Sequence, residues 1–178
     1  RSRQNIWIVM ECLAGGSLLD LLISYGRFDE KQARHYFRQI LTGVEFCHEK
    51  NIYHRDLKPD NILLTADMLV AKVADFGLAT LVEEGPTGRR KSMCGSAQYA
   101  APEIFSGDVV PYLPGPSDIW GCGILLYIMV AGFPPFQDAV HVQLIEKICA
   151  ARVRFPGWFS PELRDLIKLI LKANPSDR

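Results

Sequence analysis

The segment from Asp118 to Ala131 constrains the fold of this chain more than any other part of the sequence. After Asp118 it contains no charged residue, and apolar side chains and glycines fill most of it. A helix that is apolar on every face lies in the interior of a domain. The longest apolar run, Ile124 to Phe133, has ten residues, whereas a membrane span needs about 20. We therefore expect a buried helix and no membrane span.

Periodicity predicts further helices around this one. Asp29 and Gln32 have capping-box spacing at the start of a long helix. A short helix is expected over residues 18–24 and another over residues 138–150. Ser160 as N-cap and Pro161 at the first helical position predict a last helix. The apolar residues at helical spacing in the long helix and the last helix are Ala33, Phe37, Ile40, Val44 and Cys47, and Leu163, Leu166, Ile167, Ile170 and Leu171.

Strand signals are few. Residues 6–10 are a short apolar run of strand type. Residues 62–64 and 69–74 predict an antiparallel pair around a turn at Ala66-Asp67. Residues 78–101 lack periodicity and predict a long loop, which in compact domains is usually functional or disordered. The expected domain is mostly helical with a minor β element.

Charge and cysteine usage exclude some classes of protein. Lys+Arg and Asp+Glu number 20 each, so a general nucleic-acid or membrane surface role is not indicated. The five cysteines are scattered singly. This pattern predicts reduced thiols in the cytoplasm or nucleus, without a disulfide framework or zinc site.

Two short motifs carry candidate chemistry: HRDLKPDN at residues 54–61 and Asp75-Phe76-Gly77. A carboxylate that can take a hydroxyl proton, with an Asn and an Asp that can hold magnesium, suits phosphoryl transfer. Each motif alone also fits a purely structural role, because an Asp or Asn in such a segment often forms a hydrogen-bonded turn. Asp-Phe-Gly alone would fit an ordinary strand exit.

With Ala101-Pro102-Glu103 following in order, the motifs closely resemble the eukaryotic protein kinase signature over the whole chain. GSAQYAAPE, SDIWGCGILLY and GFPPF look closest to the calcium/calmodulin-dependent and AMP-activated group. The resemblance implies a protein-kinase-like α+β fold: a mainly helical C-lobe with a small antiparallel β element, the N-lobe being largely absent. Residues 1–178 would be a partial kinase domain, with 1–16 the hinge region and 17–178 the C-lobe without its final helix.

The resemblance also implies roles at a site that uses ATP and Mg²⁺. Asp56 would be the catalytic base, Asn61 and Asp75 the magnesium ligands, and Lys58 a cation near the γ-phosphate. Lys58 and the CGSAQYAAPE segment favour serine and threonine as acceptors, with Ser96 hydrogen-bonded toward Asp56 and Lys58.

On the adenine side, the resemblance implies Met10 as gatekeeper, with Glu11 and Leu13 offering backbone groups and Leu63 forming the pocket floor. Ser17 stands where many basophilic kinases carry a Glu that contacts the ribose and a substrate Arg. A strong preference for Arg in the substrate is therefore not expected.

Regulatory and structural roles are implied in the same way. Arg55 would pair with a phosphate placed on Ser92, or on Thr87, by an upstream kinase. Asp118 would hold the backbone of the catalytic loop, in addition to capping its own helix. The remaining structural pairs are His54 with Phe76 and Glu103 with Arg178.

We expect the protein to be a non-specific serine/threonine protein kinase that phosphorylates protein substrates. The alternative is a pseudokinase or truncated kinase-like module that only binds partners. No Gly-rich loop and no V-A-I-K lysine occurs in the 178 residues. We therefore expect the chain to be a fragment that is inactive by itself, from an active parent.

Overall fold

The computed structural model describes residues 7–81, 97–105 and 114–178. Its described part is mostly helical with two small sheets, as predicted. The helices are α1 (Leu18–Tyr25), α2 (Glu30–Glu49), α3 (Pro114–Ala131), α4 (His141–Ala150) and α5 (Pro161–Ile170). The strands are β1 (Ile52–Tyr53), β2 (Ile62–Leu64), β3 (Ala71–Val73) and β4 (Thr80–Leu81). Short 3-10 turns cover Pro59–Asn61, Phe76–Leu78, Ala97–Tyr99, Pro102–Phe105 and Pro175–Asp177.

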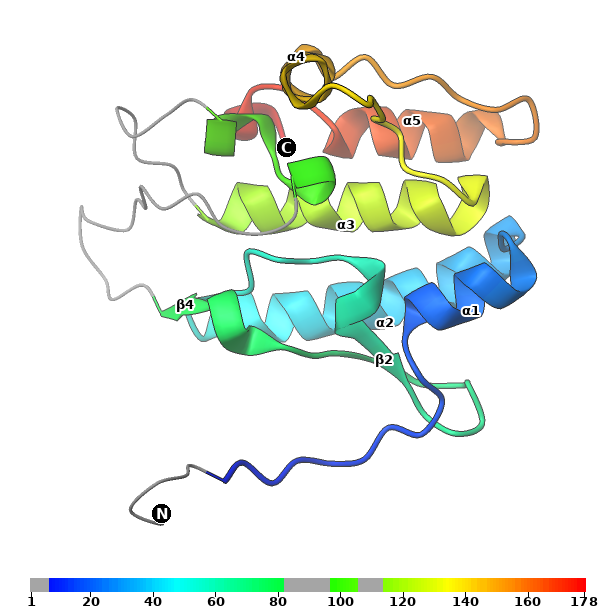
Figure 1. Cartoon of the computed structure of the whole chain (residues 1–178), viewed down its shortest axis with the longest axis vertical. Helices are drawn as coiled ribbons and strands as arrows, with labels where there is room; N and C mark the ends of the chain where they lie inside the picture. The colour runs from blue at the N-terminus through cyan, green and yellow to red at the C-terminus, as the bar shows by residue number, and fades with distance from the viewer. Residues whose placement is uncertain (1–6, 82–96, 106–113) are drawn as a thin grey trace.

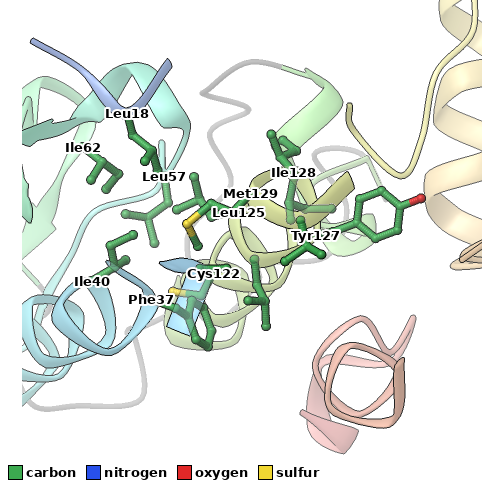
Figure 2. Close-up of a cluster of buried hydrophobic side chains, with 14 of the residues drawn as sticks. Leu18, Phe37, Ile40, Leu57, Ile62, Cys122, Leu125, Tyr127, Ile128 and Met129 are labelled. Atoms are coloured by element: carbon green, nitrogen blue, oxygen red, sulfur yellow. The ribbon is translucent and has the colours of Figure 1, made fainter. Parts of the chain in front are cut away.

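Helix α3 lies in the middle of the molecule, between α2 on one side and α4 and α5 on the other (Figure 1). Every residue from Trp120 to Ala131 is buried, which confirms the prediction of an interior helix. In Figure 2, Leu125 and Met129 of α3 lie in one cluster with apolar side chains from α1, α2 and β2. The helix begins at Pro114, so Asp118 lies inside it and not at its start.

Two glycines allow other segments to approach α3 closely. A Cβ at Gly123 would lie 2.6 Å from Cγ2 of Ile170, next to α5. A Cβ at Gly121 would lie 3.0 Å from Cβ of Leu57, in the loop between β1 and β2. The loop that carries the HRDLKPDN motif therefore packs directly on the most buried helix.

Helix α2 begins with the predicted capping box, in which Asp29 Oδ1 accepts a hydrogen bond from Gln32 N at 2.7 Å. Four of the five predicted apolar positions are buried, and Tyr36 joins them. The β2–β3 hairpin packs against α2 (Figure 1). Its strands are antiparallel in the register Ile62↔Val73, Leu63↔Lys72 and Leu64↔Ala71, which confirms the predicted pair.

Besides the helix start at Asp118, three sequence predictions about the fold are wrong. Residues 7–10 form no strand, since they are 77–96% exposed and have no strand partner among the described residues. The predicted long loop contains β4, which pairs with β1 in the register Ile52↔Leu81. The helix expected from Asp138 begins at His141, because Asp138 Oδ1 instead accepts from Val140 N at 2.8 Å in the preceding turn. No described helix is both long and apolar enough to cross a membrane.

Candidate active site

The candidate catalytic loop, residues 54–61, connects β1 to β2. Arg55 has a left-handed backbone (φ 65°), which a non-glycine residue rarely adopts. Pro59 begins a single 3-10 turn that ends at Asn61 and leads directly into β2. The loop is therefore tightly folded, and its first residues need external hydrogen-bond partners.

Asp118 of α3 supplies those partners. Its Oδ2 accepts from His54 N at 2.9 Å, and its Oδ1 accepts from Arg55 N at 2.7 Å. His48 Nε2 at the end of α2 lies 2.8 Å from the same Oδ2. The predicted contact with the loop backbone is confirmed, whereas the predicted capping role is wrong because α3 begins at Pro114. Sequence reasoning missed His48, whose only signal was a His at the C-terminal end of a predicted helix.

Asp56, Lys58 and Asn61 form one buried or half-buried cluster. Lys58 Nζ lies 2.7 Å from Asp56 Oδ2. Asn61 Nδ2 donates to Asp56 O at 2.8 Å and to Asp56 Oδ2 at 3.2 Å. The hydrogen bond to Asp56 raises the pKa of Lys58, and the carboxylates of Asp60 and Asp75 add to this effect. Lys58 is therefore a cation at neutral pH and sits beside the candidate base.

The two candidate magnesium ligands flank the open end of the β2–β3 hairpin. Asn61 precedes β2 and Asp75 follows β3, and Ala74 N donates to Asn61 O at 2.8 Å. Asp75 is exposed, with a left-handed backbone (φ 59°), and its Oδ1 accepts from Gly77 N at 3.2 Å. Since Nδ2 of Asn61 donates to Asp56, Oδ1 is the atom of that side chain that can bind a cation. A carboxylate and an amide oxygen suit Mg²⁺, so these residues fit the implied metal.

Most candidate adenine-side residues lie along the segment that precedes α1, and Leu63 lies in β2. Met10 is 80% exposed, and the side chain of Glu11 is paired with Lys72 of β3 at 2.6 Å. Leu13 and Leu63 are half-buried. Ser17 forms a bridge with Leu63, so this segment is attached to β2 where it enters α1. The structure brings Ser17 and Leu63 together, whereas it leaves Met10 on the surface.

Ser17 has a structural function. Its Oγ accepts from Asp20 N at 3.1 Å, and its backbone N donates to Asp20 Oδ2 at 2.8 Å, which completes a capping box for α1. Ser17 Oγ also donates to Asp20 Oδ2 at 2.6 Å. The hydrogen bonds from Ser17 lower the pKa of the Asp20 carboxyl. The hydroxyl that stands where many basophilic kinases carry Glu is therefore engaged within its own helix.

The structure places the members of both predicted structural pairs in contact, but His54 and Phe76 do not stack face to face. Arg178 donates from both guanidinium nitrogens to the two carboxylate oxygens of Glu103, at 2.6 and 2.8 Å. The rings of His54 and Phe76 meet edge to face, with centroids 5.0 Å apart. Arg55 Nε donates to Leu78 O at 2.7 Å, which ties the loop to the Asp-Phe-Gly segment. The candidate regulatory residues Ser92 and Thr87, and also Ser96, lie outside the described residues.

Comparison with known proteins identifies the family. The protein kinase domain family matches residues 1–178, and the chain belongs to it. The recognition made from HRDLKPDN, DFG and APE is confirmed.

Named relatives are serine/threonine or CBL-interacting protein kinases. The chain is 45% identical over 177 residues to CBL-interacting protein kinase 29 of Oryza sativa subsp. japonica, covering 99% of this chain and 39% of the relative. It is 44% identical to the probable serine/threonine-protein kinase HSL1 of Saccharomyces cerevisiae, covering 99% of this chain and 11% of that protein. It is 42% identical to CBL-interacting serine/threonine-protein kinase 8 of Arabidopsis thaliana, again covering 99% of this chain and 39% of the relative. These relatives fit the predicted group, and the chain spans well under half of their length.

Proposed function

We propose that the whole protein transfers the γ-phosphate of ATP to serine and threonine hydroxyls of protein substrates. Family membership and the names of the relatives support the class of reaction. The observation that carries the proposal is the cluster around Asp56. Its carboxylate lies 2.7 Å from the Lys58 ammonium and accepts from the Asn61 amide at 3.2 Å. An acid, a cation and an amide at these distances suit transfer of an anionic group.

The roles follow from the chemistry of each side chain. Asp56 accepts the proton of the substrate hydroxyl, which requires a carboxylate within hydrogen-bonding reach. Lys58 remains cationic beside it, because its pKa is raised, and stabilises negative charge on the transferred group. Asn61 and Asp75 hold magnesium through oxygen atoms. Bound ATP and Mg²⁺ would supply the phosphoryl group and offset the charge on its oxygens.

We further propose that residues 17–178 belong to a C-lobe and that residues 1–16 are a hinge. The run Trp7, Ile8, Val9 and Met10, which is 77–96% exposed, supports a segment that another part of the protein covers. The Gly-rich loop and the lysine that grip ATP phosphates are not among the 178 residues. By itself this chain should therefore transfer phosphate at a negligible rate.

Peptide phosphorylation with radiolabelled ATP tests the catalytic proposal on the longer parent protein. Asp56→Asn should lower kcat by about 10²–10⁴-fold, which is the range for a general base. Asp165→Asn is the matched control, because that exposed carboxylate on α5 pairs, among the described residues, with Lys168 alone. If the parent and its Asp56→Asn variant were equally inactive, the alternative of a kinase-like binding module would replace the catalytic proposal.

Regulation by phosphorylation is part of the proposal. An upstream kinase would modify Ser92 or Thr87, and Arg55 would pair with the added phosphate. The relatives named for interaction with CBL support a regulatory protein partner as well. Mass spectrometry of the active parent checks the first point: a phosphate at neither position would contradict it.

A further inference from the structure

The first half of α2 carries three exposed cations for which the described part of the chain supplies no salt-bridge partner. Lys31, Arg34 and Arg38 are spaced three and four residues apart, so they lie along one face of the helix. None of the three forms a salt bridge within the described residues. The one acid at helical spacing, Glu30, directs both carboxylate oxygens to the N and Oγ of Ser160, at 2.7 and 2.8 Å. This face is therefore positively charged.

The turn of the β2–β3 hairpin lies against the same face. Leu69 O lies 2.8 Å from His35 Nε2 and accepts from Gln39 Nε2 at 3.1 Å. Tyr36 OH donates to Met68 O at 2.8 Å, and Ala71 N donates to Gln39 Oε1 at 2.9 Å. Side chains of α2 thus fix the turn through its backbone, and the surface between them is formed before any partner arrives.

Between the helix and the turn lies a groove of about 520 Å³, which we call the α2–hairpin groove. Its lining combines the three cations with the apolar side chains of Leu69 and Val70, which are 61% and 41% exposed. A second hollow of about 540 Å³ adjoins it, sharing Lys31, His35 and Leu69. Tyr25, 68% exposed, and the buried Phe28 line this second hollow.

The acids of the second hollow are engaged locally. Asp29 accepts from Gln32 N at 2.7 Å, and Asp67 accepts from Leu69 N at 3.0 Å. Both acids line the second hollow, and neither lines the α2–hairpin groove itself. The two hollows therefore differ in charge: the α2–hairpin groove is lined by cations and no acid, whereas the second hollow has both acids among its aromatic and aliphatic side chains.

We propose that the α2–hairpin groove binds an acidic peptide segment of a protein partner. Acidic side chains of the peptide pair with Lys31, Arg34 and Arg38, and an apolar side chain enters the adjoining hollow beside Leu69. Charge complementarity selects this partner, because these three cations form no salt bridge among the described residues and attract a segment of opposite charge. The surface is separate from Asp56 and its neighbours, so binding there would recruit a protein without occupying the catalytic cluster.

Fluorescence anisotropy tests the proposal with a fluorescein-labelled peptide of glutamates and leucines, titrated with the purified full chain at ~0.15 M salt. The double variant Arg34→Glu/Arg38→Glu should bind the probe at least about tenfold more weakly, since two attractions become repulsions. Leu69→Ser should weaken binding as well. The matched control is Arg152→Glu/Lys172→Glu, which reverses two exposed cations elsewhere that form no salt bridge within the described residues and should leave binding unchanged.

Other outcomes would overturn the proposal. These are undetectable binding of the probe peptide, an equal loss of binding in the control variant, or equal binding of a probe peptide with lysines in place of the glutamates. Phosphatidylserine vesicles provide a further arm: vesicle binding lost in Arg34→Glu/Arg38→Glu, without peptide binding, would assign the groove to a membrane. Circular dichroism and thermal unfolding of each variant separate lost binding from lost folding.

Discussion

Replacement of Asp118 by alanine is the sharpest test of how this structure holds its candidate catalytic loop. The carboxylate is 2% exposed and accepts from the backbone N–H groups of His54 and Arg55 at 2.9 and 2.7 Å. Alanine removes both acceptors, and the buried surroundings of His54 admit little water to replace them. The loop must then either leave two donors without partners or refold locally.

The magnitude follows from those two donors. A buried donor left without a partner costs about 1–3 kcal/mol, so two of them cost about 2–6 kcal/mol. His48 adds less, because its side chain is 22% exposed and can turn toward water. Asp118→Asn should fall between wild type and Asp118→Ala, since its amide retains one acceptor oxygen but faces the second N–H with a donor. Typical domains have about 5–15 kcal/mol of stability, so the alanine variant should be severely weakened.

Urea unfolding followed by tryptophan fluorescence measures the loss, because Trp120 lies fully buried near Asp118 on α3. Amide hydrogen exchange at His54 and Arg55 reports the loop separately and should accelerate in both variants. Asp165→Ala is the control, since its exposed pair with Lys168 should contribute no more than about 1 kcal/mol. A free energy of unfolding for Asp118→Ala within about 1 kcal/mol of wild type, with unchanged exchange at both amides, would refute the reasoning.

Three further predictions concern other contacts. Arg178→Ala should lower the free energy of unfolding by about 3–5 kcal/mol in urea, because Glu103 keeps a charge that is 9% exposed without its partner. Gly123→Ala should cost about 1–3 kcal/mol by forcing α5 off α3, whereas Gly157→Ala, with open space around its Cβ, should change little in the same assay. The raised pKa of Lys58 means that its stabilising effect is complete below the ordinary value of 10.5 and is lost as pH rises through the folded value. The stability difference between wild type and Lys58→Met should therefore stay constant from neutral pH up to the ordinary value of 10.5 and shrink only above 10.5. Shrinkage near neutral pH would contradict the assigned direction.

Strong local signals predicted most of the fold. The all-apolar α3, the capping box at Asp29 and the Ser160-Pro161 start of α5 each depend on residues close together in sequence, so they could be read directly. The β1–β4 pair could not be predicted, because two-residue strands with 26 residues between them (80 − 53 − 1 = 26) carry no periodicity of their own. The strand prediction at residues 7–10 was wrong for the opposite reason: β propensity is present there, but it does not make a strand without a partner.

The candidate site shows the same division. The HRDLKPDN motif predicted that Asp56, Lys58 and Asn61 act together, and the structure places their side chains in contact. The role of His48 depends on the end of α2 meeting the interior of α3, which only tertiary packing decides. The capping box of α1 was likewise not predicted, although the spacing of Ser17 and Asp20 is typical of one. The cations of the α2–hairpin groove gave no motif at all.

The spacing between the two candidate magnesium ligands depends on the register of the β2–β3 hairpin. Asn61 and Asp75 come from the two free ends of a ladder whose register pairs Ile62 with Val73. A slip of one residue would displace one ligand by about 3.3 Å and turn its side chain to the opposite face. Octahedral Mg²⁺ requires ligand distances of ~2.1 Å, so such a slip would abolish the candidate site while leaving both candidate ligands in the sequence. Insertions within β2 or β3 should therefore be far more damaging to metal binding than insertions of equal length at the turn around Asp67.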